Sequence, residues 1–79
     1  MWRTNKITIE TPTEKETYTY WAKTYDEGSE WGIDGGRISK LEVRDSAGRI
    51  VINYERGWDR EPKTILEQAA LQAIKNMHN

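Results

Sequence analysis

The chain has 79 residues, enough for a single domain over residues 1–79, and its 12 basic and 13 acidic residues leave a net charge of −1. This balance argues against a protein that coats DNA non-specifically, and equally against an acidic mimic of DNA. The chain contains no cysteine, and because a secreted domain of this size usually needs disulfides, we expect a cytoplasmic protein.

The first predicted element is a strand over residues 3–10, with Ile7 and Ile9 on one face. Residues 11–14 form the turn that follows, because Pro12 fixes φ and has no N–H to donate to a strand ladder. No run here resembles the apolar segment of a signal peptide, and none in the chain reaches the roughly 20 apolar residues that cross a bilayer. We therefore expect neither a leader nor a membrane anchor.

A second strand over residues 16–25 follows from its Tyr and Thr residues, which favour strands. Trp21 and Tyr25 share one of its faces. The other face carries Tyr18, Tyr20 and Ala22. Both faces are thus partly apolar, which is unusual for a sheet that is covered on one side only.

Residues 25–37 form an acidic loop rich in glycine, with four of the six glycines and four of the thirteen acidic residues. This composition suits neither strand nor helix, and structured loops on small scaffolds often carry function. Gly35 and Gly36 are expected to allow positive φ at a bulge before the next strand. A phosphate loop is disfavoured, because such glycines open a helix rather than a strand.

The most secure hairpin joins strands over residues 37–44 and 49–55, in which apolar and polar residues alternate. Residues 45–48 form its turn, and Gly48 supplies the left-handed position. Residues 57–62 are then expected to break the sheet. The predicted sheet is therefore a four-stranded antiparallel meander.

A C-terminal helix completes the chain. Asp59 caps it with Pro62 in the first turn, or Thr64 caps it with Glu67 closing a capping box. The apolar stripe that faces the sheet consists of Ile65, Leu66, Ala69, Ala70, Ala73, Ile74 and Met77. We expect fraying at the end of the chain, over Asn76, His78 and Asn79.

The predicted fold is α+β, with the strand and helix order ββββα and the single helix packed on one face of the sheet. One helix cannot cover both faces. Either the open face is solvated, or its Trp and Tyr residues meet a partner.

The segment YDEGSEWGIDGGRISKL at residues 25–41, followed by NYERGWD at residues 53–59, resembles a family of small uncharacterised proteins encoded by phages, prophages and bacteria. The resemblance covers about residues 18–66. It implies a cytoplasmic setting, in a bacterial cell or a phage-infected host, and it carries over no catalytic or binding residue. Because phage genomes contain many small proteins that disable host defence enzymes, the resemblance favours an inhibitor of a host defence protein.

Catalysis has little support in the sequence, so we expect no enzyme and no cofactor. The one histidine, His78, lies beside an end that we expect to fray. The serines, Ser29, Ser39 and Ser46, are in no nucleophile elbow. A metal site of the His/Cys type is excluded, and the spacing of Asp26, Glu27, Glu30 and Asp34 departs from calcium-binding loops.

Protein binding is the function that the sequence favours. Trp31 and Trp58 each adjoin a glycine in a predicted loop, and tryptophan is enriched among interface anchors. The alternative is that both rings fold back over the core. We expect opposite charges to join the two loops and rim one patch. The expected partner-binding residues are Asp26, Glu30, Trp31, Trp58, Arg56 and Arg60, together with Trp21 and Tyr25.

Two further interpretations remain open. A single-stranded nucleic acid or a nucleotide would stack on the aromatic residues of an open sheet beside arginines. The residues expected there are Tyr18, Tyr20, Trp21 and Tyr25, with Arg37, Arg44 and Arg56. A homodimer would instead bury the first strand, as an exposed edge, and the uncovered face.

Overall fold

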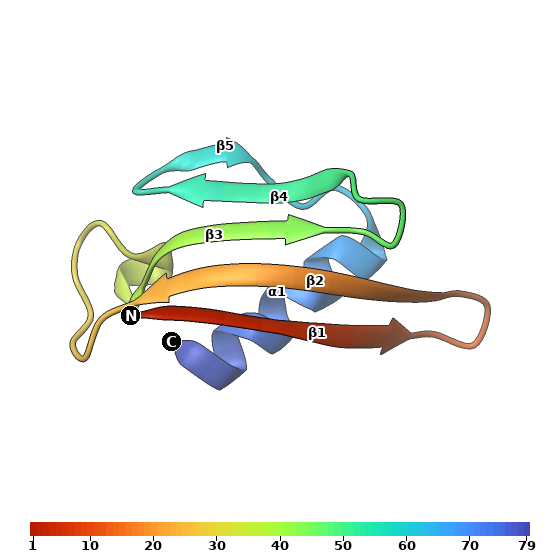
Figure 1. The fold of residues 1–79 in the computed structure, drawn as a ribbon, viewed down its shortest axis with the longest axis horizontal. Coiled ribbons are helices and arrows are strands. Elements are labelled where there is room, and N and C mark those ends of the chain that lie inside the picture. The colour runs from red at the N-terminus through yellow and green to blue at the C-terminus, as the bar shows by residue number, and fades with distance from the viewer.

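The computed structural model describes residues 1–79 as one antiparallel sheet with one helix behind it (Figure 1). The sheet is a meander of five strands in chain order. The strands are β1 (Trp2–Glu10), β2 (Lys15–Thr24), β3 (Ile38–Arg44), β4 (Ile50–Glu55) and β5 (Trp58–Arg60). A 3-10 turn, η1 (Ile33–Gly35), lies between β2 and β3, and the helix α1 (Ile65–His78) follows β5. The helix is too short and too polar to span a membrane.

The predicted α+β class is confirmed, and the bounds of the four predicted strands agree with β1 to β4 within one residue. The count of four strands is wrong. The segment that was expected to break the sheet turns back and forms β5, in which Trp58 pairs with Tyr54. Arg56 takes the left-handed conformation of this turn, with φ 57°, and the Glu55 N–H donates to the Gly57 carbonyl at 2.9 Å. The sequence analysis missed the hairpin of β4 and β5 because an arginine, and not a glycine, occupies the left-handed position of its turn.

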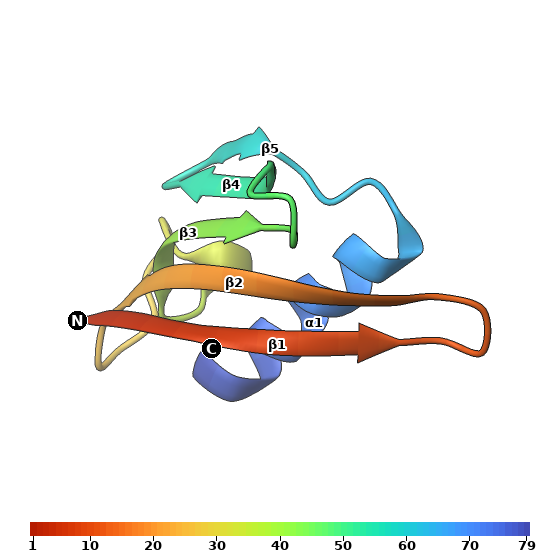
Figure 2. The same ribbon diagram turned by 45° about the vertical axis from the view of Figure 1, so that its right-hand side comes forward.

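The core lies between α1 and the face of the sheet that the helix covers (Figure 2). Tyr18, Tyr20 and Ala22, which were predicted to share one face of their strand, all point into it. The helix contributes Ala70 and Ile74, both fully buried. The predicted apolar stripe is wrong at both ends, since Ile65 is 76% exposed at the start of the helix and Met77 is 50% exposed near its end.

The helix begins at the second of the two predicted caps. The Glu67 N–H donates to Thr64 Oγ1 at 3.0 Å, and Glu67 Oε1 accepts from the N–H of Thr64 and, at 2.9 Å, from that of Lys63. These bonds satisfy donors that the first helical turn leaves without partners. Asp59, the alternative cap, lies in β5.

Replacing Thr64 with alanine is expected to lower the free energy of unfolding by about 1 kcal/mol, because the Glu67 N–H loses its acceptor. Urea unfolding followed by circular dichroism measures the change. The control is Thr13→Ala, since Thr13 is exposed and its hydroxyl makes no hydrogen bond. Equal effects of the two substitutions would show that the cap contributes nothing specific.

The end of the chain is ordered, contrary to the expected fraying. His78 Nε2 lies 2.8 Å from the Tyr20 hydroxyl, and the two groups share a hydrogen bond. The Asn79 side chain donates to the Ile33 carbonyl at 2.9 Å and accepts from the Ile38 N–H at 3.1 Å. The Asn76 side chain accepts a hydrogen bond from the Gln72 side chain within the helix and makes no contact of this kind with the loop. The helix end is therefore docked on the loop before β3, through contacts between segments far apart in the chain.

The expected positive φ values are confirmed at two glycines and not at the third. Gly48 has φ +83° in the turn between β3 and β4, and Gly35 has φ +71° in η1. Gly36 has φ −91°, so the left-handed conformation does not explain why a glycine stands here. A Cβ at Gly36 would lie 2.1 Å from Asn79 Oδ1, so this glycine makes room for the docked side chain of Asn79.

Candidate functional site

The acidic loop at residues 25–37 is folded against the helix side of the sheet. Ile33, 2% exposed, anchors it in the core. Its backbone closes on itself, with the Ser29 N–H donating to the Gly36 carbonyl at 3.2 Å and the Gly36 N–H to the Ile33 carbonyl at 2.9 Å. Asp34 pairs with Lys75 of the helix. The loop therefore belongs to the packed structure and holds Trp31 in a defined place.

Tyr54 contacts both the backbone of Trp31 and the ring of Trp58. The Tyr54 hydroxyl donates to the Trp31 carbonyl at 2.8 Å. The Tyr54 ring meets the Trp58 ring edge to face, with centroids 4.9 Å apart and an interplanar angle of 72°. Both tryptophans stay accessible, with 57% of Trp31 and 39% of Trp58 exposed. We call these three residues the Trp31/Trp58 surface.

The charged residues that were expected to rim this surface do not join the two loops. The ion pairs of the structure are Lys40–Glu55, Arg44–Glu42, Arg49–Asp45 and Lys75–Asp34. Arg60 instead donates through Nε to the Val51 carbonyl at 3.2 Å. Asp26, Glu30 and Arg56 are exposed and make no ion pair. The loop contact is made by Tyr54, a strand residue that the sequence analysis did not single out.

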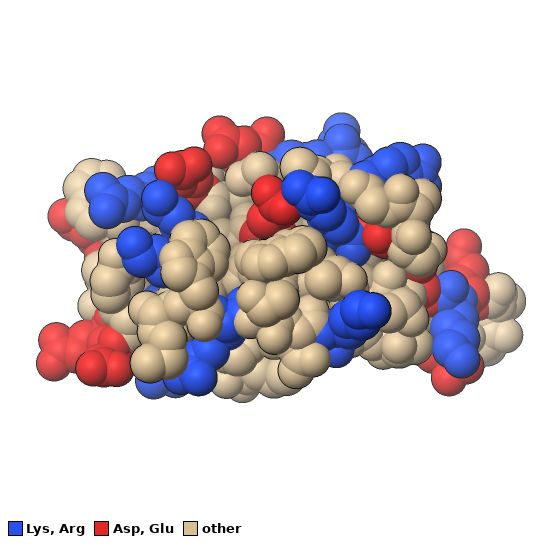
Figure 3. Space-filling view, in the orientation of Figure 1, with Lys and Arg blue, Asp and Glu red and all other residues tan.

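Trp21 lies, as predicted, on the face of the sheet opposite that of Tyr18, Tyr20 and Ala22, and so it does not join Trp31 and Trp58, with which it was expected to bind a partner. Its neighbour there is Arg44, whose guanidinium carbon is 5.5 Å from the Trp21 ring centroid. Trp2 and Trp21 line a shallow hollow with Glu42 and Arg44. Figure 3 shows this face, where uncharged side chains fill the middle and charges of both signs surround them. Trp21 is therefore separated from the Trp31/Trp58 surface by the sheet.

Trp2 was missed by the sequence analysis, which started the first strand at residue 3. In the structure Trp2 opens β1, pairs with Lys23 and is 56% exposed. Tyr25 lies just past the end of β2, 46% exposed, with Lys23 Nζ 5.7 Å from its ring centroid. Trp2 alternates along the chain with Thr4 and Lys6, and this pattern could have indicated that the strand begins at Trp2.

Two of the residues expected to stack on nucleic-acid bases cannot do so. Tyr18 is 3% exposed and Tyr20 is 1% exposed, and both face the helix. Burial raises the pKa of both hydroxyls above the usual value near 10. Only Trp21 and Tyr25 remain accessible from the expected set on the second strand.

No group of three or more Asp, Glu or His side chains is placed to hold a metal ion. Asp45 is engaged in the turn between β3 and β4, where its carboxylate accepts from the N–H groups of Ala47 and Arg49 and from the Arg49 side chain. These bonds, above all that from the Arg49 N–H, lower the pKa of Asp45 below its usual value. Its role is that of a turn residue.

Comparison with known proteins gives one match. A family model described as "Domain of unknown function (DUF7678)" matches residues 1–79. This is consistent with the resemblance to a small uncharacterised family, and it extends over the N-terminal strand that lay outside the resemblance. No curated protein and no solved structure matches the chain significantly.

Proposed function

The chain belongs to this family of unknown function, and we propose that it is a non-catalytic module that binds another protein through exposed tryptophans. More specifically, we propose that the protein is a phage- or prophage-encoded inhibitor that acts in the bacterial cytoplasm on a host defence protein. The observation that supports binding is the position of the tryptophans. All four lie outside the buried core, whose aromatic residues are the tyrosines Tyr18, Tyr20 and Tyr54.

Keeping the four tryptophans outside the core lowers the folding stability that so small a domain could reach. Only 17 of the 79 residues are buried, so each further apolar side chain in the core would add appreciably to stability. Tryptophan buries more apolar area than most residues, about 150–250 Å², and its N–H suits the boundary between protein and water. Tryptophans left at the surface are well suited to become buried against a partner.

The Trp31/Trp58 surface is the best contact site because its parts are already held in place. The Tyr54 hydroxyl fixes the backbone of Trp31, and the Tyr54 ring packs against Trp58. Little conformational entropy would therefore be lost when a partner orders the Trp31 backbone and the Trp58 ring. Asp26, Glu30 and Arg56 are free to pair with charges on the partner at the rim, where charges contribute more to orientation than to affinity.

Single-stranded nucleic acid is the second candidate, on the other face of the sheet. Trp2 and Trp21 offer two accessible rings beside Arg44, the combination on which bases stack. Glu42 weakens this candidate, because its carboxylate lies 2.8 Å from Arg44 Nε and already pairs with the arginine. Binding of this kind would weaken steeply as salt concentration rises.

A pull-down from bacterial lysate tests the proposal, with tagged protein, moderate salt and added nuclease. We expect one protein to be retained in stoichiometric amount by the wild type. The double variant Trp31→Ala/Trp58→Ala should lose it, because truncating a central tryptophan of an interface costs about 2–4 kcal/mol, roughly a 30-fold to 1,000-fold loss of affinity.

The matched control is Trp2→Ala/Trp21→Ala, which removes the same side chains from the opposite face and should retain the partner. Circular dichroism establishes that both variants are folded. Retention by the Trp31/Trp58 variant would refute the assigned surface. A bound species that disappears with nuclease would favour the second candidate, and a complex containing only copies of this chain would favour a homodimer through β1.

A further inference from the structure

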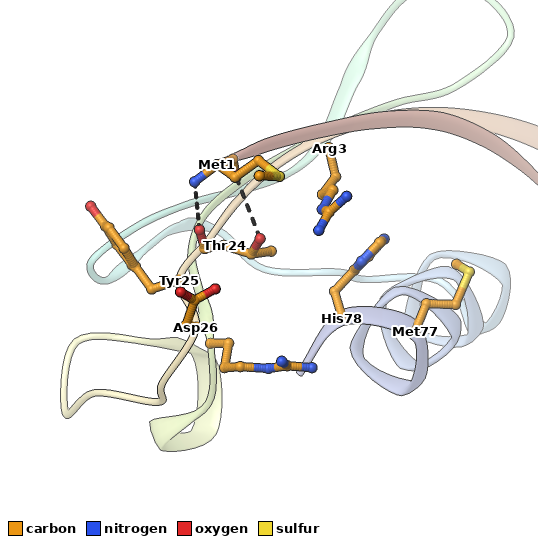
Figure 4. Close-up of a pocket in the computed structure, with 8 residues that line it drawn as sticks. Met1, Arg3, Thr24, Tyr25, Asp26, Met77 and His78 are labelled. Carbon is orange, nitrogen blue, oxygen red and sulfur yellow. Dashed lines mark hydrogen bonds between the residues drawn. The ribbon is translucent and has the colours of Figure 1, made fainter.

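A pocket of about 300 Å³ lies where the end of β2, the start of β1 and the end of α1 meet (Figure 4). Its basic and acidic side chains come from Arg3 on β1, Arg37 just before β3, His78 on the helix and Asp26 in the acidic loop. The amino group of Met1, another lining residue, donates to the Thr24 carbonyl at 2.7 Å. Half-exposed Met77 adds an apolar wall. None of the four tryptophans lines this pocket, although Tyr25 and Asp26, two of the expected partner-binding residues, do.

The two arginines in this pocket have no partner. Neither Arg3 nor Arg37 makes an ion pair or a side-chain hydrogen bond, whereas Arg44, Arg49 and Arg60 each do. Arg3 pairs through its backbone with Ala22 and so belongs to the face that the helix covers. Figure 4 shows Arg3 and His78 pointing toward one another across the pocket.

The pKa of His78 responds to the positive charge of the pocket. Its ring is half-buried and is held by the hydrogen bond to the Tyr20 hydroxyl at 2.8 Å. Burial lowers the pKa of His78 below the ordinary value near 6.5, and the charges of Arg3 and Arg37 lower it further. The imidazole is therefore neutral at pH 7, and the two guanidinium groups carry the charge of this wall.

Asp26 is the one acidic residue of the lining. Its carboxylate points toward Thr24, away from the space between Arg3 and His78 (Figure 4). It makes no ion pair with either arginine. The two arginines against this one aspartate leave a single net positive charge on the side chains that line the pocket.

We propose that this pocket binds a small phosphomonoester, with its phosphate held by Arg3 and Arg37 beside His78 and its organic group against Met77. The planar guanidinium matches phosphate oxygens in two parallel hydrogen bonds, and two such groups match the two charges of a phosphate dianion. The volume lies at the lower end of the range of small-molecule pockets, about 300–1,000 Å³. The ligand is therefore no larger than a mononucleotide.

His78 reports on binding without a label, because it is the only histidine of the chain. Its imidazole proton signal is followed by NMR across pH, with increasing inorganic phosphate or 5′-AMP, and with sodium chloride at matched ionic strength. Bound phosphate should raise the pKa of His78 by about 1 and saturate, because an adjacent negative charge favours the imidazolium. Sodium chloride should raise it less, by screening alone.

Arg3→Gln and Arg37→Gln test the assignment. Each should raise the pKa of His78 in the free protein, by removing a positive charge, and should abolish the saturable response to phosphate. Arg49→Gln is the control, because Arg49 lies in the turn between β3 and β4 and pairs with Asp45. It should respond to phosphate as the wild type does.

Four results would overturn the proposal. The first is a phosphate effect no stronger than that of sodium chloride at equal ionic strength, and the second is a wild-type response in the Arg3 and Arg37 variants. Acetate as effective as phosphate would reject selectivity for phosphate. Tighter binding of 5′-AMP than of inorganic phosphate supports a phosphomonoester, and equal binding would overturn the proposal in favour of a site for inorganic phosphate alone.

Discussion

Replacing Ile74 with alanine is expected to remove about 2–5 kcal/mol from the free energy of unfolding. Ile74 is fully buried where α1 crosses the sheet, so its truncation leaves a cavity between the two layers. A domain of 79 residues typically has a stability of about 4–12 kcal/mol in total. The single change should therefore leave the protein marginally folded. Urea unfolding, followed by circular dichroism and by tryptophan fluorescence, measures the loss.

The matched control is Ile65→Ala in the same helix. Ile65 is 76% exposed, so the same atoms are removed without a cavity, and the change should stay within about 0.5 kcal/mol. Similar losses for the two variants would mean that the helix does not pack on the sheet through Ile74.

The second large effect is expected from Gly32→Ala, in the acidic loop. A Cβ at Gly32 would lie 2.0 Å from the Gly36 carbonyl oxygen and 3.2 Å from that of Ile38. Both atoms belong to the backbone, so no side chain can turn aside to relieve the clash. The φ of Gly32 is −77°, which alanine adopts readily, and the cost is therefore steric. Destabilisation should reach or exceed about 1–3 kcal/mol, the usual cost of forcing extra atoms into a packed site.

Gly57→Ala provides the control, since a Cβ there meets no atom within 4 Å. Its unfolding free energy should differ from the wild type by at most about 0.5 kcal/mol. Limited proteolysis then locates the damage, because Gly32→Ala should expose residues 25–37 to cleavage. A wild-type proteolysis pattern together with wild-type stability for Gly32→Ala would show that the loop is not packed as described.

The packing of residues 25–37 should also affect the proposed binding function. Trp31 owes its position to the packing of Ile33 and to the bond between its carbonyl and the Tyr54 hydroxyl. A displaced loop should weaken partner binding even though the Trp31 side chain is intact. Gly32→Ala and Trp31→Ala would therefore weaken binding for different reasons, the first with lost stability and the second without it.

The sequence by itself determined the elements whose signals are local. Alternating apolar residues located β1 to β4 within one residue, Gly48 marked the turn between β3 and β4, and Thr64 with Glu67 marked the start of the helix. These features depend on residues a few positions apart, where sterics and backbone hydrogen bonding decide the conformation.

The tertiary structure decided the rest. A pattern of residue types could not show whether a tryptophan is buried, and the structure leaves Trp31 and Trp58 accessible on either side of Tyr54. Nor could it show that Asn79 docks on Ile33 and Ile38, across separations of 46 and 41 residues, or that Arg3 and Arg37 line one pocket with His78. Such contacts arise only when the helix and the loop pack on one sheet, because side-chain hydrogen bonds and charge interactions depend on distance in space and leave no periodic trace along the chain.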